Sequence, residues 1–157
     1  MSESEHGRIP DGLYRQIVEA VPIFTVDVLF FDADRQRTLL FKRANEPAKG
    51  EYFCIGGRVL KNESPTEAAV RKAKEELGLK ISADDLWFGG LSDDIFETSS
   101  FPGVPIHNVN AHWGCIWPGG REITLDDQHT EYAWFDVTEP SLHTLVKERI
   151  SNLLNSA

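Results

Sequence analysis

Cysteine, methionine and long apolar runs are all scarce in this sequence. Its 157 residues include two cysteines, Cys54 and Cys115, and one methionine. Two distant cysteines without a CxxC pair are typical of neither a zinc finger nor a disulfide-stapled secreted scaffold. We therefore expect a reducing, cytoplasmic location, with both thiols packed as small apolar groups. The longest apolar run, residues 21–31, is interrupted by Thr25 and Asp27 and is too short to span a bilayer.

Positive charge is also in deficit. Sixteen Lys and Arg residues against 25 Asp and Glu residues give a formal net charge of −9 at pH 7. This balance argues against a broad basic face for nucleic acid or an anionic membrane, but it allows a small anionic ligand held by local cations or a metal. The polar, acidic residues 1–7 lack the basic and apolar regions of a signal peptide. We expect one domain over residues 1–157, with a flexible N-terminus at residues 1–10.

Hydrophobic patterning predicts helices at both ends of the chain and strands between them. Apolar residues at helical spacing favour a short helix from Asp11 to Val21 and a C-terminal helix whose apolar stripe runs from Leu142 to Leu154. Runs rich in β-branched and aromatic residues predict strands at 23–31, 38–42, 52–55, 86–97, 107–117 and 132–135, the first two forming a hairpin. This order predicts an α/β fold with a curved mixed sheet between helical layers.

A third helix is indicated by its end signals. Ser64 can cap it, Pro65 suits its first position, Glu67 completes a capping box, and Gly78 stands where a left-handed C-cap belongs. The predicted span is Pro65 to Leu77. Later in the chain, the Ser-, Pro- and Gly-rich loop at residues 98–105 is a candidate lid or specificity loop.

Charged residues of this helix form a stripe that follows two glycines. Glu67, Arg71 and Glu75 are spaced four apart on one face, with Glu76 about 100° further round. A solvated face with ordinary ion pairs explains most stripes of this kind. Here it must also explain the pair Gly56-Gly57, which lets the backbone turn so that a carbonyl can point at a cation.

The pattern resembles the Nudix box. The matching positions are Gly57, Glu63, Arg71, Ala73, Glu75, Glu76, Gly78 and Leu79. One position departs, because Lys72 stands where the box has a Glu directly after its Arg. The resemblance implies a Nudix-like α/β/α sandwich. It also implies hydrolysis of a nucleoside diphosphate linked to another group, with Mg²⁺ or Mn²⁺ held by carboxylates and a glycine carbonyl. Carboxylate and carbonyl oxygens are the ligands that such hard cations prefer.

Segments 42–59 and 125–135 are further similar to the GDP-mannose mannosyl hydrolases, a Nudix branch that also lacks a complete box. The resemblance covers about Pro22 to Phe135. It implies that water attacks the anomeric carbon of a GDP-sugar, GDP-mannose or GDP-glucose, releasing GDP and the free sugar. The substrate partner would be a nucleoside diphosphate sugar. Homodimerisation is an expectation from the family.

The same resemblance assigns metal and base positions. It implies that Mg²⁺, or Mn²⁺, is held by the carbonyl of Gly56 and the side chains of Glu76 and Gln128, with Glu75 as a further candidate ligand. His129 would be the general base, and imidazole's ordinary pKa near 6.5 suits that role at neutral pH.

The substrate side of the resemblance rests on one aspartate and several arginines. Arg43 would stabilise the departing diphosphate with help from Arg58, and Asp27 would contact the sugar or orient the site. An outward-facing edge position is the alternative for Asp27. Arg71 either binds substrate or forms a salt bridge with Glu67 or Glu75 that orients the box, and the sequence favours neither.

Two other functions stay open. Retained Glu63 and Glu75 allow a conventional Nudix pyrophosphohydrolase that cleaves a P–O bond of ADP-ribose or another nucleoside diphosphate sugar. The incomplete box allows a non-catalytic module that binds a nucleotide sugar. The pyrophosphohydrolase is the second candidate, and the binding module ranks third because the proposed metal ligands and the candidate base occur together.

Overall fold

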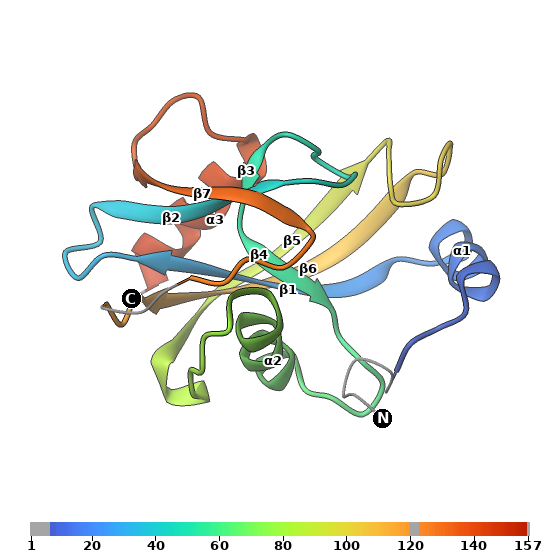
Figure 1. Cartoon of the computed structure of the whole chain (residues 1–157), viewed down its shortest axis with the longest axis horizontal. Coiled ribbons are helices and arrows are strands. Elements are labelled where there is room, and N and C mark those ends of the chain that lie inside the picture. Colours follow the sequence, from blue (N-terminus) through green and yellow to red (C-terminus); the bar gives the residue numbers. More distant parts are fainter. Residues whose placement is uncertain (1–6, 120–122, 157) are drawn as a thin grey trace.

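The computed structural model describes residues 7–119 and 123–156. In these residues the chain forms helices on both sides of a mixed sheet (Figure 1). The helices are α1 (Asp11–Ala20), α2 (Pro65–Leu77), the 3₁₀ helix η2 (Ala83–Asp85) and α3 (Thr144–Ser156). The strands are β1 (Ile23–Phe31), β2 (Arg37–Arg43), β3 (Tyr52–Phe53), β4 (Ile55–Arg58), β5 (Leu86–Phe96), β6 (Ile106–Ile116) and β7 (His129–Asp136). The predicted order of the main elements is confirmed.

Strand β1 lies at the centre of the sheet and shares one of its edges between two partners. On its other edge it runs parallel to β6 along its whole length. On the shared edge, residues 25–28 pair antiparallel with β4, while Phe30 and Phe31 pair antiparallel with β2 as the predicted hairpin. Strand β2 also pairs with β3 and β7, and β5 pairs with β6. The second half of β2 therefore leaves β1 and makes room beside β4.

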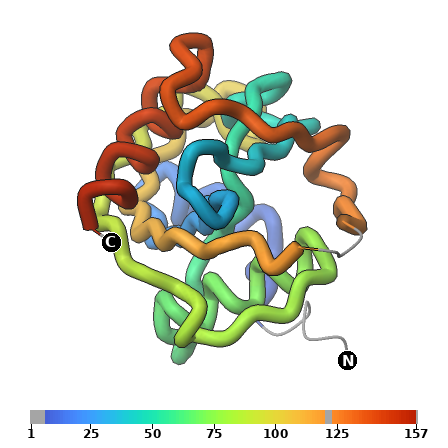
Figure 2. The backbone as a smooth tube through the Cα atoms, turned by 90° about the vertical axis from the view of Figure 1, so that its left-hand side faces the viewer, coloured from blue at the N-terminus to red at the C-terminus, as the bar shows by residue number. Residues whose placement is uncertain are grey.

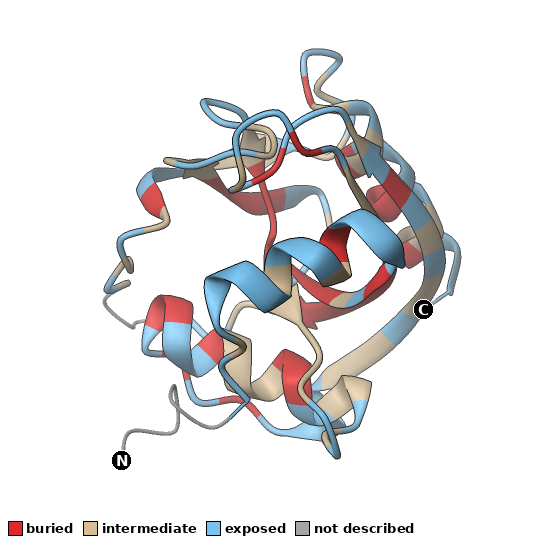
Figure 3. Cartoon of the chain, turned by 90° about the vertical axis from the view of Figure 1, so that its right-hand side faces the viewer, coloured by how far each residue is buried: buried red, intermediate tan, exposed pale blue. Residues whose placement is uncertain are grey.

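Both faces of the sheet are covered because both faces of β1 are apolar. Successive strand residues point to opposite faces, so Val28 and Phe30 pack in one core with apolar residues of α2. Leu29 and Phe31 pack in a second core with apolar residues of α3. Burying each such side chain contributes about 1.5–3 kcal/mol. Helices α2 and α3 lie on opposite sides of the sheet (Figures 1 and 2), and burial is concentrated on strands and inner helix surfaces (Figure 3). This is the predicted α/β/α sandwich, with an open sheet.

The local chemistry of α2 matches the sequence prediction. The Ser64 side chain accepts a hydrogen bond from the Glu67 backbone N–H at 3.1 Å, and the Glu67 carboxylate accepts one from the Ser64 backbone N–H at 2.7 Å. Gly78 ends the helix with φ of 64°. Glycine adopts this left-handed conformation without the cost that a Cβ brings. The helix is thus fixed at both ends, which fixes the positions of the box residues along it.

Some boundaries differ from the prediction. Strand β7 begins at His129 rather than Tyr132, because the backbone of His129 already pairs with Arg43 of β2. The expected flexible N-terminus falls outside the described residues at positions 1–6, whereas Gly7 is placed and its carbonyl accepts a hydrogen bond from Arg58 at 2.6 Å. Cys54 and Cys115 are buried thiols, as expected. In the described part of the chain, every helix is too short or too polar to cross a membrane.

Candidate active site

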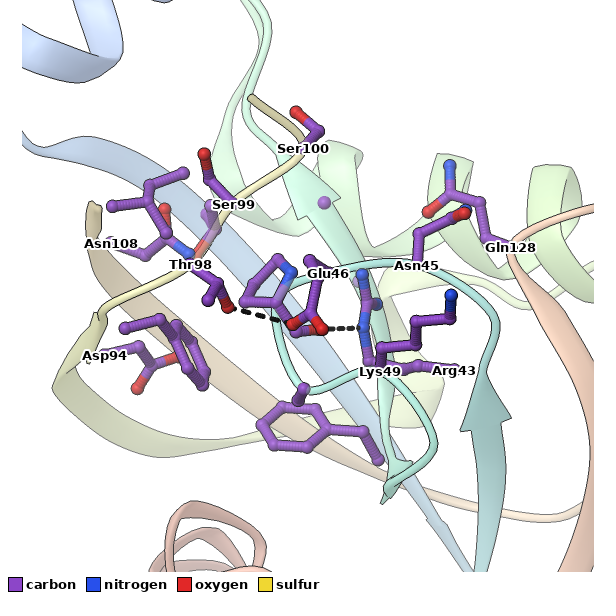
Figure 4. Close-up of a pocket in the computed structure, with 18 of the residues that line it drawn as sticks. Arg43, Asn45, Glu46, Lys49, Asp94, Thr98, Ser99, Ser100, Asn108 and Gln128 are labelled. Carbon is purple, nitrogen blue, oxygen red and sulfur yellow. Dashed lines mark hydrogen bonds between the residues drawn. The ribbon is translucent and has the colours of Figure 1, made fainter. Parts of the chain in front are cut away.

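A cavity of about 770 Å³ lies where β2 leaves β1. Its wall includes Asp27 of β1, Arg43 of β2 and the Gly56-Gly57 pair of β4. The loops at 44–49 and 98–103 complete its rim. Figure 4 shows Arg43, Lys49 and Gln128 on one side and Asp94 and Thr98 on the other. The cavity is thus lined by residues of β1, β2 and β4 together with two loops.

Glu76 is a buried carboxylate beside this wall. Only 1% of the residue is exposed, and its Oε2 accepts a hydrogen bond from the Gly56 backbone N–H at 2.9 Å. Its Oε1 has no hydrogen-bond partner in the described structure. Burial raises the pKa of Glu76 to about 7, although the Lys72 ammonium opposes the shift. A buried oxygen without a hydrogen-bond donor is a position that a cation can satisfy.

His129 is held in one orientation by a carboxylate. Its Nδ1 lies 2.8 Å from Asp126 Oδ1, and its side chain is fully buried. Burial lowers the pKa of His129, while Asp126 opposes that effect. Across residues 7–119 and 123–156 no group hydrogen-bonds to Nε2. If the carboxylate accepts the Nδ1 proton, Nε2 is a free base.

Glu76, Asp126 and His129 form one group whose candidate ligand atoms all lie within 4.8 Å of one another. A backbone hydrogen bond from Asp126 N–H to the Glu76 carbonyl, 3.2 Å long, ties the 126–129 segment to the end of α2. Two carboxylates, one of them with an unpartnered oxygen, suit a hard divalent cation. The sequence did not lead us to predict Asp126 as a site residue. The only pattern that pointed to it was its position three residues before His129.

Of the other expected metal ligands, Gln128 and Gly56 line the cavity, whereas Glu75 is engaged in ion pairs. Gln128 lines the cavity, and its backbone carbonyl accepts a hydrogen bond from the Ala44 backbone N–H at 2.8 Å. Gly56 also lines the cavity, and a Cβ built on it would lie 2.0 Å from Asp27 Oδ1, so no larger residue fits. Glu75 instead pairs with two cations, Arg71 at 3.0 Å and Lys72 at 3.3 Å.

Arg71 forms the salt bridges that orient the box. Its guanidinium donates two hydrogen bonds to Glu63, of 2.7 and 3.0 Å, and a third to Glu75 at 3.0 Å. A further bond of 3.0 Å reaches the Arg58 carbonyl. Glu75 was one of its two predicted partners, whereas Glu67 is occupied by the capping box. Arg71 thus fastens the end of β4, and the loop that follows it as far as Glu63, to α2. Among the described residues it lies outside the cavity lining.

Arg43 and Arg58 both line the cavity. Arg43 Nε donates to the Pro47 carbonyl at 2.7 Å, which steadies the side chain and leaves its terminal nitrogens available for an anion. Arg58 lies over the ring of Tyr14, with its Cζ 5.7 Å from the ring centroid. Lys49 adds a third cation to the rim. With Lys72, four cationic side chains of the described residues line the cavity, alongside the carboxylates of Asp27, Glu46 and Asp94.

Asp27 is buried in the cavity floor, which excludes the edge position considered for it. Its Oδ2 lies 3.0 Å from Arg149 Nε and accepts a hydrogen bond from Cys54 Sγ at 3.1 Å. Arg149 of α3 is fully buried and also pairs with Asp94 of β5, a second lining residue. Burial raises the pKa of Asp27 to about 6 against the pull of Arg149. The sequence reading missed Arg149 and Asp94.

The loop at 98–105 closes one side of the cavity. Thr98 Oγ1 donates a hydrogen bond of 2.9 Å to Glu46 Oε2 (Figure 4). This bond joins the β5–β6 loop to the β2–β3 loop, and residues of both loops line the cavity. The role of the 98–105 loop as a lid or specificity loop stays a prediction.

An α/β/α sandwich with buried carboxylates beside an arginine-lined cavity is an arrangement suited to enzymes that take an anionic substrate and a divalent metal. Within that class, the chain belongs to the Nudix family, because the NUDIX domain model matches residues 22–155. A similar sequence is the low-salt glycan biosynthesis protein Agl8 of Haloferax volcanii, 32% identical over 93% of this chain and 91% of that protein.

Solved structures share the fold. The MutT NUDIX hydrolase of Burkholderia pseudomallei matches with a TM-score of 0.67 at 21% identity, over 84% of this chain and 98% of that one. The NUDIX domain of Shewanella oneidensis NrtR, solved with ADP ribose, matches with a TM-score of 0.64 at 15% identity, over 92% and 96%. The chain is a Nudix hydrolase. Members of this family act on nucleoside diphosphate derivatives and generally use divalent ions such as Mg²⁺ or Mn²⁺.

Proposed function

We propose that this Nudix hydrolase cleaves a GDP-sugar, GDP-mannose or GDP-glucose, by attack of water at the anomeric carbon. The observation that carries the proposal is the buried Asp126–His129 pair, which leaves His129 Nε2 unpartnered among the described residues beside Glu76. A histidine oriented by a carboxylate is suited to remove a proton from water. The proposal therefore assigns the base to β7 rather than to a glutamate of the box.

The chain's own residues have the following roles in this reaction. His129 Nε2 takes one proton from water as the water oxygen bonds to the anomeric carbon, and the bond from that carbon to the diphosphate oxygen breaks. Arg43 and Arg58 bind the diphosphate, which leaves with both electrons of that bond. Asp27, fixed by Arg149, orients the sugar from the cavity floor.

Glu76, the Gln128 side chain and the Gly56 carbonyl would hold Mg²⁺ or Mn²⁺, and Asp126 joins this set. When bound, the cation neutralises charge on the leaving diphosphate. The His129 side chain is buried, and in the described structure Gln128 rather than His129 lines the cavity. The proposal thus requires the substrate complex to open a path from the cavity to Nε2, as catalytic contacts often tighten only when substrate binds.

Hydrolysis in ¹⁸O-labelled water tests the proposal directly. GDP-mannose, GDP-glucose and ADP-ribose are each incubated with the protein and Mg²⁺, and the products are analysed by mass spectrometry. We expect one ¹⁸O atom in the free sugar and unlabelled GDP. Label in a phosphate group would overturn attack at carbon, and ligand-induced thermal stabilisation without turnover would overturn catalysis.

A conventional pyrophosphohydrolase is the second candidate. Glu63 and Glu75 of the box are retained, and the NrtR domain of similar fold was solved with ADP ribose. Both carboxylates are already paired with Arg71, which favours a structural role for them.

We also propose that the protein forms a homodimer in the cytoplasm. Size-exclusion chromatography with light scattering measures the oligomeric state.

A further inference from the structure

Lys72 occupies the one box position that departs from the family pattern, and its side chain points into the carboxylate group of the site. Its Nζ lies 3.3 Å from Glu75 Oε2 and 3.6 Å from Glu76 Oε1. The side chain is 12% exposed and lines the cavity. Glu76 Oε1 is the buried oxygen that no group hydrogen-bonds in the described residues.

The side chain is confined to this position by the backbone opposite it. A Cβ built on Gly57 would lie 2.7 Å from Lys72 Cε, so the glycine leaves the space that the lysine stem fills. An ordinary helix ion pair leaves its lysine free to move into solvent. Lys72 instead sits between a buried carboxylate and a backbone wall, with its charge directed at two carboxylates on successive residues.

We propose that the Lys72 ammonium is a built-in cation of this active site, which takes the place of a second divalent ion between Glu75 and Glu76 and restricts the site to one metal. This inference rests on the proposed metal site at Glu76. In water-poor surroundings, a positive charge a few ångströms from a carboxylate strongly weakens the binding of a further cation. The fixed positive charge of Lys72 also leaves less negative charge on these carboxylates for a metal to neutralise.

Manganese binding to the apo protein tests this inference without measuring activity. The wild type, Lys72→Met and Lys72→Glu are titrated with Mn²⁺, and the free ion is followed by its electron paramagnetic resonance signal. Lys74→Met and Lys74→Glu are the matched controls. They make the same charge changes on the same helix, but Lys74 is exposed. Circular dichroism confirms that each variant is folded.

We expect the wild type to bind one Mn²⁺ per chain. Lys72→Met should bind its ion roughly tenfold more tightly or better, because the competing charge is gone. Lys72→Glu, with three carboxylates together, should bind two ions. Both Lys74 variants should match the wild type.

Three outcomes would count against this proposal, and they are distinct. Equal stoichiometry and affinity for the wild type and the Lys72 variants would overturn the role of Lys72 while leaving the metal site intact. Binding of Mn²⁺ by none of the five proteins would overturn the metal dependence in the proposed function, and the inference with it. An equal gain in Mn²⁺ affinity in the Lys72 and Lys74 variants would show that only the net charge of the protein matters, and would overturn the specific role of Lys72.

Discussion

The imidazole of His129 lies at the first residue of β7 and combines two features. It is fully buried, and its Nδ1 is engaged by Asp126 at 2.8 Å. Burial without a partner at Nε2 costs free energy. The unpartnered Nε2 suits two chemical roles, that of a general base and that of a metal ligand. The two roles differ in what a substitution would change.

His129→Gln separates the two roles. If His129 is the base, kcat falls by about 10²–10⁴-fold with a modest change in KM, and Mn²⁺ affinity stays at the wild-type value. Steady-state kinetics with the GDP-sugar and the Mn²⁺ titration measure these quantities. His107→Gln is the control, since His107 is partly exposed and pairs with Asp93. An unchanged kcat would remove His129 from the reaction, and a parallel loss of Mn²⁺ affinity would make it a ligand.

Single residues also show where sequence reasoning stops. Glu76, Gln128 and His129 were predicted as site residues because the box and the branch resemblance fix their positions. Asp126 carried no motif, and its pairing with His129 depends on how the segment before β7 folds back onto α2. Arg149 lies within the apolar stripe of the last helix, where a buried arginine makes sense only once Asp27 is known to face it.

At the scale of elements, the helices and strands followed closely from local pattern. Helix α2 has the predicted cap at each end, and β1 has the predicted bounds. The division of the β1 edge between β4 and β2 was not predictable, because strand pairing joins residues distant in sequence and depends on packing against both helices. The cavity lies at this division, so its position followed only from the folded sheet.

Arg149 ties α3 to two strands of the sheet. It lies 3.0 Å from Asp27 of β1 and pairs with Asp94 of β5, and all three residues are buried. Arg149→Met removes the cation and leaves two buried carboxylates without it. We expect the free energy of unfolding to fall by about 3–5 kcal/mol, as measured by urea denaturation at pH 7.

The control for this change is Lys147→Met, which removes a charge from the exposed side of the same helix. Its stability should stay near that of the wild type. The double change Asp27→Asn with Arg149→Met should recover part of the loss, since it removes one of the uncompensated charges. Equal stabilities for Arg149→Met and Lys147→Met would show that the buried cluster does not hold α3 in place.

At the scale of the whole molecule, a net charge of −9 would repel the anion that this protein is proposed to bind. The two are compatible because the charged side chains are separated in space. Arg43, Lys49 and Arg58 all reach one cavity, whereas Glu76 and Asp126 gather where a metal would bind. Composition excluded a broad basic face but could not reveal this separation of charges.

The pH dependence of stability is set in part by a buried histidine away from the proposed metal ligands. His112 of β6 is fully buried, its Nε2 lies 3.2 Å from Asn152 Nδ2, and burial lowers its pKa to about 4. In the unfolded chain its pKa is near 6.5. Below pH 6.5 the unfolded state therefore binds a proton that the folded state does not, so stability falls as the pH falls towards 4.

His112→Gln, which cannot titrate, isolates this contribution. Between pH 7.5 and pH 5.5 the wild type should lose about 1.4 kcal/mol more of its free energy of unfolding than the variant, because one pKa unit corresponds to about that amount. Urea denaturation of both proteins at the two pH values gives the difference, and the other histidines cancel because both proteins carry them. Parallel losses in the two proteins would mean that the pKa of His112 is the same in the folded and the unfolded chain, which would overturn the effect of burial on this histidine.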